Sequence, residues 1–562
     1  MLLGYLTLSF LFFGVRIAAH PERMVVGGLF TDPQIFVWSF AWWPHAILHG
    51  DNPFYTHAIW APSGFNLAWA TSVPALALVF VPLTLAFGPV LAYNVACLVV
   101  PALAAWAAFV LCRHITRRFW PSAVGGYLFG FSSYVLSAEL THINTAAVFT
   151  LPLAALLVLR FLEGNLSARA LTVELAVLLA LQAYLSTELL FTLTLELGSA
   201  LVLALAFFPP VRAQLVRLAI PLAGAFVLGA VLAAPLLYYA LTGYDTRPPI
   251  GSEDFVADAL NFVVPTRASL GGWWSAALAG HFPATDAERG AYLGLPSVAI
   301  VCWFALRRWR TACGRFLVGS LTLVALESLG SWLTVDGQRV VTLPWVHLAS
   351  RPLFDAIMPV RLSVYTALAA GVIVAIWAAS TSPRTWLRVV LAGLAVLAVV
   401  PNLTWGAWAR TPAVPSLFTT GLYRSCLGHG ENVMLLPFGP LGDSLFWQVD
   451  SRFWFRVAGG YISPAPPPPF TEPHSIEQIA ASDLPPKVTA RAVAQFARLK
   501  GVTAIVLDAR EEPIWRPVLA RLAHPQAVGG ALIYRLSGGT ASSPGCSRAR
   551  ASARSGNDVS AH

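Results

Sequence analysis

The segment VLAYNVACLVVPALAAWAAFVLC (90–112) contains no charged side chain. A helix rises about 1.5 Å per residue, so roughly 20 apolar residues cross the hydrocarbon core of a bilayer. The segment therefore predicts a membrane-spanning helix. Further candidate spans lie near 1–19, 120–138, 145–162, 170–186, 189–208, 218–240, 291–306, 316–334, 362–380 and 387–403. We expect an α-helical polytopic membrane protein with about eleven spanning helices.

The composition agrees with this fold class. Hydrophobic residues make up 57% of the 562 residues and charged residues only 11%, whereas a soluble protein carries about 25% charged residues. A net charge of +9 is also found in nucleic-acid-binding proteins, but Lys occurs only at Lys487 and Lys500. Most Arg residues form short clusters between apolar runs, which is typical of membrane topology. Nucleic acid is therefore not expected as a partner.

The N-terminal segment 1–19 is apolar enough to be either a signal peptide or a first span. It has no basic residue before the apolar run and no obvious small-residue cleavage site after it, and both are features of a signal peptide. We therefore predict an uncleaved first span.

The apolar run Val73 to Phe87 decides the orientation of the whole chain. If it spans the membrane, the basic clusters fall on opposite sides. If Pro74 and Pro82 break it into an interfacial or re-entrant segment, every basic cluster falls on one side, as the positive-inside rule requires. These clusters are Arg113 to Arg118, Arg160 with Arg169, Arg212 with Arg217, Arg307 to Arg315, and Arg384 with Arg388. The second interpretation places the segments 20–89, 139–144, 241–290, 335–361 and the chain after 404 outside a plasma (inner) membrane.

The segment after residue 403 has a different composition. NVMLLPF (432–438), TAIVLD (503–508) and ALIYRL (531–536) are short apolar runs typical of strands, and 476–499 is typical of a helix interrupted by Pro485 and Pro486. We therefore divide the chain into a transmembrane domain at 1–403, a small extracytoplasmic α/β domain at 404–540 and a disordered tail at 541–562. Cys426 and Cys546 lie in this outer part, where a disulfide is possible.

The first outward loop, 20–89, contains the stretch TDPQIFVWSFAWWPHAILHGDNPFYTHAIWAPSGFNLAWATS (31–72). Its aromatic residues between Phe36 and Trp43 suit a helix that lies in the membrane interface. Asp32 precedes this helix, so its carboxylate either caps the helix N-terminus or serves a reaction.

This order of parts resembles the GT-C superfamily of polyprenyl-phosphate-dependent membrane glycosyltransferases, which includes oligosaccharyltransferases and aminoarabinose transferases. The features that match are one span, an outward loop with an early Asp-Pro, many further spans and an outer C-terminal domain. FSSYVLSAELTHIN (131–144), AYLGLP (291–296) and RPLFDAIMPVRL (351–362) are also similar to segments of bacterial membrane proteins of this kind. The usual acidic pair after Asp32, an Asp-x-Asp in the second outward loop and a WWD-type motif are missing.

The resemblance implies sugar transfer from a polyprenyl-phosphate-linked donor to a glycan, lipid or protein acceptor of the cell envelope. Asp32, with Asp51 as second choice, is then the catalytic carboxylate. Arg361, or else Arg351, is expected to hold the donor phosphate. Glu139, His142, Asn144 and Glu327 are expected to line the donor cavity, where Glu139 and His142 share a helix face and could hold a divalent cation with Asp32. A cofactor cannot be assigned beyond that cation.

Two other functions fit the same composition. A transporter or lipid flippase also needs many spans and intramembrane carboxylates, although related halves with matching broken helices are not evident in this sequence. A non-catalytic protein with the same fold is the other alternative, because fold alone does not establish activity.

Overall fold

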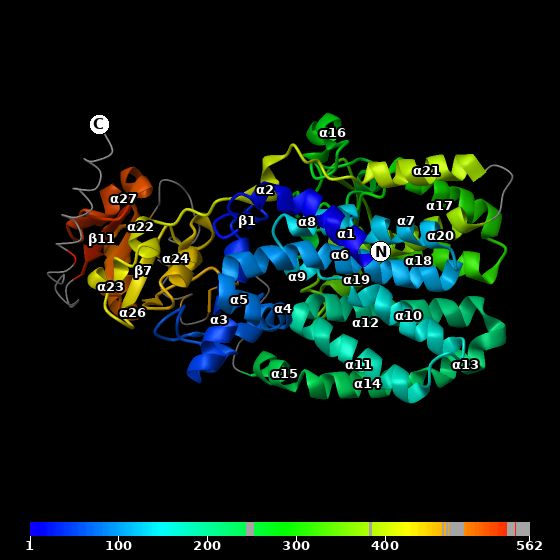
Figure 1. Cartoon of the computed structure of the whole chain (residues 1–562), viewed down its shortest axis with the longest axis horizontal. Coiled ribbons are helices and arrows are strands. Elements are labelled where there is room, and N and C mark those ends of the chain that lie inside the picture. Colours follow the sequence, from blue (N-terminus) through cyan, green and yellow to red (C-terminus); the bar gives the residue numbers. More distant parts are fainter. Residues whose placement is uncertain are drawn as a thin grey trace.

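The computed structural model describes residues 1–242, 252–380, 385–463, 466–467, 470, 488–536 and 546. Helices pack side by side in the larger part of the molecule, and a five-stranded sheet lies at one end, on the left of Figure 1. Six helical segments of the described residues are long and apolar enough to cross a membrane: Pro89–Thr116, Ile143–Leu162, Ala168–Leu185, Thr187–Phe207, Pro209–Leu232 and Pro359–Ala379. Two shorter apolar helices cover Leu2–Ile17 and Thr385–Ala398. The chain is a multi-pass membrane protein.

The helices of the larger part follow the apolar runs of the sequence. They are α1 (Leu2–Ser9), α2 (Val15–Ile17), α3 (Pro33–His49), α4 (Pro74–Val79), α5 (Val81–Phe87), α6 (Pro89–Thr116), α7 (Phe119–Gly130), α8 (Ser133–Glu139), α9 (Ile143–Ala146), α10 (Thr150–Leu162), α11 (Ala168–Leu185), α12 (Thr187–Phe207), α13 (Arg212–Arg217), α14 (Ala219–Leu232), α15 (Ala234–Leu241), α16 (Gly272–Ala279), α17 (Leu295–Arg308), α18 (Ala312–Ser328), α19 (Val346–Ala349), α20 (Ser363–Ala379) and α21 (Thr385–Ala398). Two predicted spans are divided: 120–138 into α7 and α8, and 218–240 into α14 and α15, where Pro235 stands in the first turn of α15.

Small residues bring the central helices into close contact. α6 and α7 pack so closely that a Cβ atom added at Gly130 would lie 2.2 Å from the backbone nitrogen of Ala105. Lipid tails are as apolar as the helix surfaces, so close packing through small residues is a main source of helix association in a membrane. The Gly-rich segment 125–130 therefore belongs to the packing core of the bundle.

The run Val73 to Phe87 forms two short helices, α4 and α5, which meet at Phe80. Pro74 and Pro82 each stand in the first turn of one of them. The predicted break is confirmed, and neither helix is long enough to cross a bilayer.

Helix α3 corrects the prediction that its aromatic residues lie in the membrane interface. Trp38, Trp42 and Trp43 are buried in the protein. The indole Nε1–H of Trp38 donates to Gln448 Oε1 at 2.7 Å, and the Trp38 ring contacts Phe453 edge-on. These aromatic residues are buried against the C-terminal part of the chain and against the rest of the first loop, which supply the same apolar surroundings as lipid.

The C-terminal sheet has the strand order β10-β11-β9-β7-β8. β7 pairs in parallel with β8 and β9, whereas β11 is antiparallel to both β9 and β10. The strands are β7 (Asn432–Leu436), β8 (Arg456–Val457), β9 (Ala504–Asp508), β10 (Pro525–Val528) and β11 (Ala531–Arg535), with helices α22 (Ser416–Thr419), α23 (Tyr423–Cys426), α24 (Ser444–Asp450), α26 (Ala490–Lys500) and α27 (Glu512–Leu519). The three strands predicted from the sequence are present as β7, β9 and β11. Of the predicted helix at 476–499, the part up to 487 lies outside the described residues, as does the tail after 536 apart from Cys546.

Hydrogen bonds join the first loop to this C-terminal part. Gln34 of α3 accepts from the backbone of Leu445 at 3.2 Å and donates to the carbonyl of Gly442 at 2.9 Å. The two-residue strands β1 (Val25–Val26) and β6 (Ala409–Arg410) also pair. The remaining strands form two hairpins, β2 (Tyr55–Thr56) with β3 (Phe65–Asn66) and β4 (Trp332–Val335) with β5 (Gln338–Thr342).

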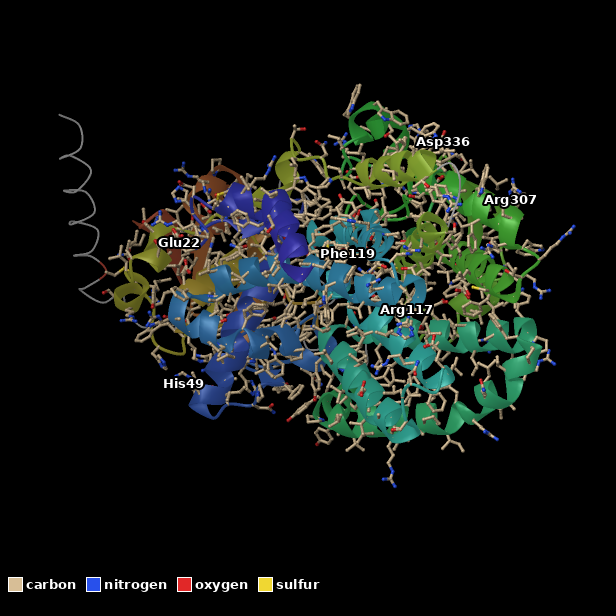
Figure 2. All side chains as sticks on the ribbon, turned by 45° about the vertical axis from the view of Figure 1, so that its right-hand side comes forward. Glu22, His49, Arg117, Phe119, Arg307 and Asp336 are labelled. Carbon is tan, nitrogen blue, oxygen red and sulfur yellow. A yellow bond between two sulfur atoms is a disulfide. The ribbon has the colours of Figure 1, made fainter. Side chains whose placement is uncertain are left out.

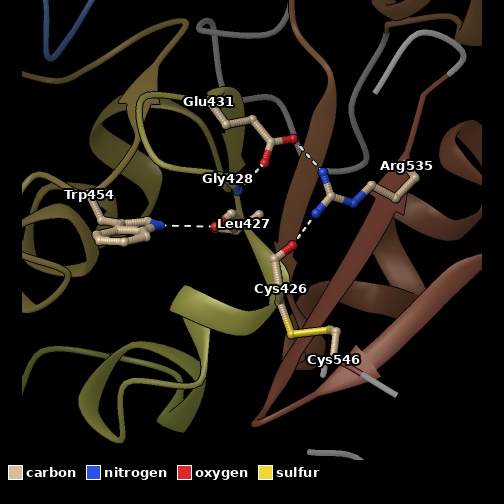
Figure 3. Close-up of a disulfide and its surroundings, with 7 residues drawn as sticks. All are labelled: Cys426, Leu427, Gly428, Glu431, Trp454, Arg535 and Cys546. Carbon is tan, nitrogen blue, oxygen red and sulfur yellow. Dashed lines mark hydrogen bonds and ion pairs between the residues drawn. A yellow bond between two sulfur atoms is a disulfide. The ribbon is translucent and has the colours of Figure 1, made fainter. Parts of the chain in front are cut away.

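Cys426 and Cys546 form a disulfide across 120 residues of sequence (Figure 3). Beside it, Arg535 of β11 forms an ion pair with Glu431 and donates to the carbonyl oxygen of Cys426. The possible bridge between these cysteines is therefore present, and it ties the chain after β11 back to α23.

Candidate functional site

Asp32 lies immediately before α3, and the residue is 7% exposed. Its carboxylate forms no capping hydrogen bond with the helix. Instead, the hydroxyl of Tyr461, in the segment after β8, donates to Asp32 Oδ1 at 2.5 Å. Helix capping therefore does not explain the position of the Asp32 side chain.

His142 lies between two carboxylates. Its Nε2 atom is 3.5 Å from Asp32 Oδ2, and its Nδ1 atom is 3.4 Å from Glu288 Oε1. The hydroxyl of Thr141 lies 2.8 Å from Nδ1. An imidazole in this position can carry a proton between the carboxylates or bind them as a cation.

Arg361 is the buried cation of the site, with only 8% of its surface exposed. Its Nε and Nη2 atoms hold Glu288 in a fork, at 3.1 Å and 2.5 Å, and its Nη1 atom contacts the Glu188 carboxylate. Glu188 Oε1 also accepts from the backbone N–H of Met358 at 3.2 Å. A planar guanidinium suits this paired arrangement of carboxylate oxygens.

The surroundings set the charge of two of these groups. Burial by itself would raise the pKa of Glu288, but the Arg361 guanidinium, with His142, outweighs it and holds that pKa below its ordinary value. Burial, and then the neighbouring Asp32 carboxylate, raises the pKa of Tyr461. At neutral pH Glu288 is therefore an anion and Tyr461 a neutral hydrogen-bond donor.

These contacts form a continuous chain of polar side chains, which we call the Asp32–Arg361 cluster: Tyr461, Asp32, His142, Glu288, Arg361 and Glu188. Its members come from six separate segments, and Asp32 and Tyr461 are 429 residues apart in sequence. Three of the predicted site residues, Asp32, His142 and Arg361, are brought together here.

Glu139 and Asn144 lie close to His142 in sequence but not in the cluster. Glu139 ends α8, is 2% exposed, and accepts from no N–H or O–H group of the described residues, with the thiol of Cys97 beside it. α8 ends before His142, so Glu139 and His142 do not share a helix face, contrary to the prediction. Asn144, in α9, is buried, and its Oδ1 atom also has no partner in the described part of the chain.

The other predicted residues lie elsewhere. Asp51 is exposed beyond the far end of α3, about 25 Å from Asp32 along that helix. Arg351 is exposed between α19 and Arg361, and it forms no ion pair with a described residue of the cluster. Glu327 of α18 lies beside Glu196 of α12 in the helical bundle.

Glu188, Glu288 and Tyr461 were not predicted as site residues. Glu288 belongs to the predicted outward segment 241–290. Its charge was visible in the sequence, but the sequence did not show that Arg361 and His142 contact it. Glu188 stands in the first turn of α12, where the helix dipole favours an acidic side chain without any further role. Tyr461 has no local signal. In the described part of the chain, no three His, Cys, Asp or Glu side chains are grouped so that they could hold a metal ion.

No protein-family model and no curated protein sequence matches the chain. Arabinofuranosyltransferase AftD from Mycobacteria matches it with a TM-score of 0.56 and 15% identity over 96% of this chain. The chain spans only 40% of the AftD chain. The oligosaccharyltransferase AglB from Archaeoglobus fulgidus, solved with an inhibitory peptide and a dolichol-phosphate, has a TM-score of 0.50 and 13% identity, over 91% of this chain and 70% of AglB.

AglB tethered to an acceptor peptide with the NVT sequon gives a TM-score of 0.51 and 14% identity, over 91% of this chain and 69% of that one. Similarity at such low identity establishes a fold and leaves the reaction open. The match nevertheless extends along more than nine-tenths of this chain in each of these structures. This protein therefore shares the polytopic membrane fold of the AftD and AglB structures.

Proposed function

We propose that the protein is a membrane glycosyltransferase that moves a sugar from a polyprenyl-phosphate-linked donor to a glycan, lipid or protein acceptor of the cell envelope. The observation that carries this proposal is the convergence of a buried carboxylate, an imidazole and a buried guanidinium in the Asp32–Arg361 cluster. Such a reaction needs a group that takes the acceptor proton and a cation that receives the leaving phosphate.

In this proposal Asp32 takes the proton of the acceptor hydroxyl or amide as that group attacks the anomeric carbon. Tyr461 occupies Asp32 Oδ1 and so fixes the orientation of the carboxylate. Asp32 Oδ2 lies beside His142 Nε2, so a proton gained there can pass to the imidazole. The bond from the anomeric carbon to the phosphate oxygen breaks as the new bond forms, and the phosphate keeps the electron pair.

Arg361 binds that phosphate in place of one of its two carboxylate partners, Glu188. Its fork to Glu288 uses two nitrogen atoms, whereas Glu188 is held through Nη1 alone. A phosphate oxygen that displaces Glu188 therefore leaves the fork intact and keeps Glu288 against His142. Arg361 stands where the last long span begins, so the polyprenyl tail of the donor can remain in lipid.

We also propose the topology of about eleven spans, with the Asp32–Arg361 cluster and residues 404–540 on the extracytoplasmic side of the plasma (inner) membrane. The basic clusters at Arg113 to Arg118 and Arg307 to Arg315 then face the cytoplasm. The Cys426–Cys546 disulfide supports this orientation, because disulfides persist in oxidising compartments.

The disulfide leads to a stability prediction. Its two cysteines close a loop of 120 residues, and a cross-link of that length stabilises the folded state by about 4–5 kcal/mol in the chain-entropy account. We expect Cys426→Ser, or reduction of the wild type, to lower the unfolding temperature of the C-terminal part in detergent. Cys302→Ser, which removes an exposed free cysteine of α17, is the matched control. Equal unfolding of the oxidised and reduced wild type would contradict the prediction.

The proposed function is tested by reconstitution. The purified full chain is placed in sealed liposomes with a polyprenyl-phosphate donor that carries a radiolabelled sugar, together with a cell-envelope extract as acceptor. We expect label to pass to acceptor material. Movement of intact donor between the leaflets without transfer of label identifies a flippase instead and overturns the proposal.

A further inference from the structure

A second polar feature lies at the opposite end of the bundle. α17, α20 and α21 enclose a cavity of about 270 Å³ whose polar and aromatic lining is Trp303, Arg307, Arg308, Trp377, Ser380 and Arg388. Trp377 is about 24 Å from Arg361 along the helix that both belong to. Arg307 lies at the end of the helical bundle away from the C-terminal sheet (Figure 2). The cavity is therefore separate from the Asp32–Arg361 cluster.

Three guanidinium groups meet at this cavity, and no described Asp or Glu forms an ion pair with any of them. Arg307 lies over the ring of Trp303, 5.3 Å from its centroid. Arg388 lies over Trp377 at 5.4 Å and donates to the Ser380 hydroxyl at 2.5 Å. Aromatic faces therefore hold two of the three cations in place, without neutralising them.

Trp377 adds a second observation. Its side chain lines the cavity and is 7% exposed, yet its indole Nε1–H has no acceptor among the described residues. Buried donors in proteins are almost always hydrogen-bonded. The cavity thus combines three guanidinium groups that no described carboxylate neutralises with the unpaired indole N–H of Trp377. All of these groups suit a negatively charged ligand that accepts hydrogen bonds.

We propose that this cavity binds the phosphate group of an anionic phospholipid in the membrane leaflet opposite the Asp32–Arg361 cluster. Arginine matches phosphate oxygens through paired donors. The cavity lies where α17 and α20 end, which places it at headgroup level, and half-exposed Trp303 is a residue type enriched there. Phe304 and Ile376 supply an apolar wall for the first carbons of the acyl chains. Basic pockets between spanning helices on that side bind anionic headgroups.

The proposal is tested by lipid titration of the purified full chain in neutral detergent, with native mass spectrometry as the readout. We expect phosphatidylglycerol to bind at least 10-fold more tightly than phosphatidylcholine. The variant Arg307→Gln/Arg308→Gln/Arg388→Gln loses this preference. Arg310→Gln, which removes an exposed arginine outside the cavity lining, keeps it. Equal binding of phosphatidylglycerol by the triple variant and the wild type overturns the proposal.

Further arms of the same titration identify the source of the phosphate. Inorganic phosphate that displaces phosphatidylglycerol at equal concentration overturns the lipid assignment, and so does at least 10-fold tighter binding of polyprenyl phosphate. If the triple variant does not remain monodisperse, Trp377→Phe removes the buried N–H donor and keeps an aromatic ring beneath Arg388. That variant is expected to bind phosphatidylglycerol several-fold more weakly, and unchanged binding contradicts the assignment.

Discussion

Replacing Asp32 with Asn is expected to lower the rate of sugar transfer by about 10²–10⁴-fold, the usual range for loss of a positioned acid–base group. The protein should keep its wild-type unfolding temperature, because the amide oxygen of the new side chain can still accept the hydrogen bond of Tyr461. The amide cannot take a proton from an acceptor group, so the loss falls on the chemical step. Transfer of radiolabelled sugar and thermal unfolding in the same detergent measure the two effects.

Asp51→Asn is the matched control for this experiment. It makes the same chemical change beyond the opposite end of α3, at an exposed position. We expect it to leave both transfer and unfolding unchanged. Full transfer by Asp32→Asn would remove Asp32 as the essential carboxylate, whereas equal losses in the two variants would indicate an effect that is not specific to the cluster.

Replacing Arg361 with Leu is expected to destabilise the folded protein by about 3–5 kcal/mol, the usual effect of removing one partner from a buried ion pair. Glu188 and Glu288 would then lose the cation that both of them contact. Thermal unfolding in detergent at neutral pH measures the loss, and sugar transfer is expected to disappear with it. An unfolding temperature equal to that of the wild type would contradict the buried network.

A compensating variant tests whether the loss of stability comes from unpaired charge or from the changed shape of the side chain. When Glu188→Gln and Glu288→Gln are added to Arg361→Leu, the unpaired charges are gone, so most of the stability should return without activity.

The pH dependence of the stability has a definite sign. The pKa of Glu288 is lowered from its ordinary 4.5, so its stabilising interaction with Arg361 is present at neutral pH and is lost as the pH falls below that value. The deficit of Arg361→Leu should therefore shrink in acid.

Much of the membrane fold can be predicted from local sequence. Long uncharged runs predict the spans, because lipid solvates no exposed charge or unpaired backbone group. Pro74 and Pro82 predict the break between α4 and α5. Short apolar runs locate β7, β9 and β11. Asp32 and Arg361 stand out because the resemblance to the superfamily calls for an early carboxylate in the first outward loop and a cation at the outer end of a span.

The site itself depends on contacts between distant segments. Glu188, Glu288 and Tyr461 acquire their roles only by meeting Arg361 and Asp32, and no local pattern encodes a contact across 429 residues. The aromatic residues of α3 show the same limit, because lipid and a protein interior are equally apolar. The sequence by itself determined which segments enter the membrane, since that choice depends on the solvation of each segment alone. Tertiary packing decided which charges share a site, since that depends on how the segments meet.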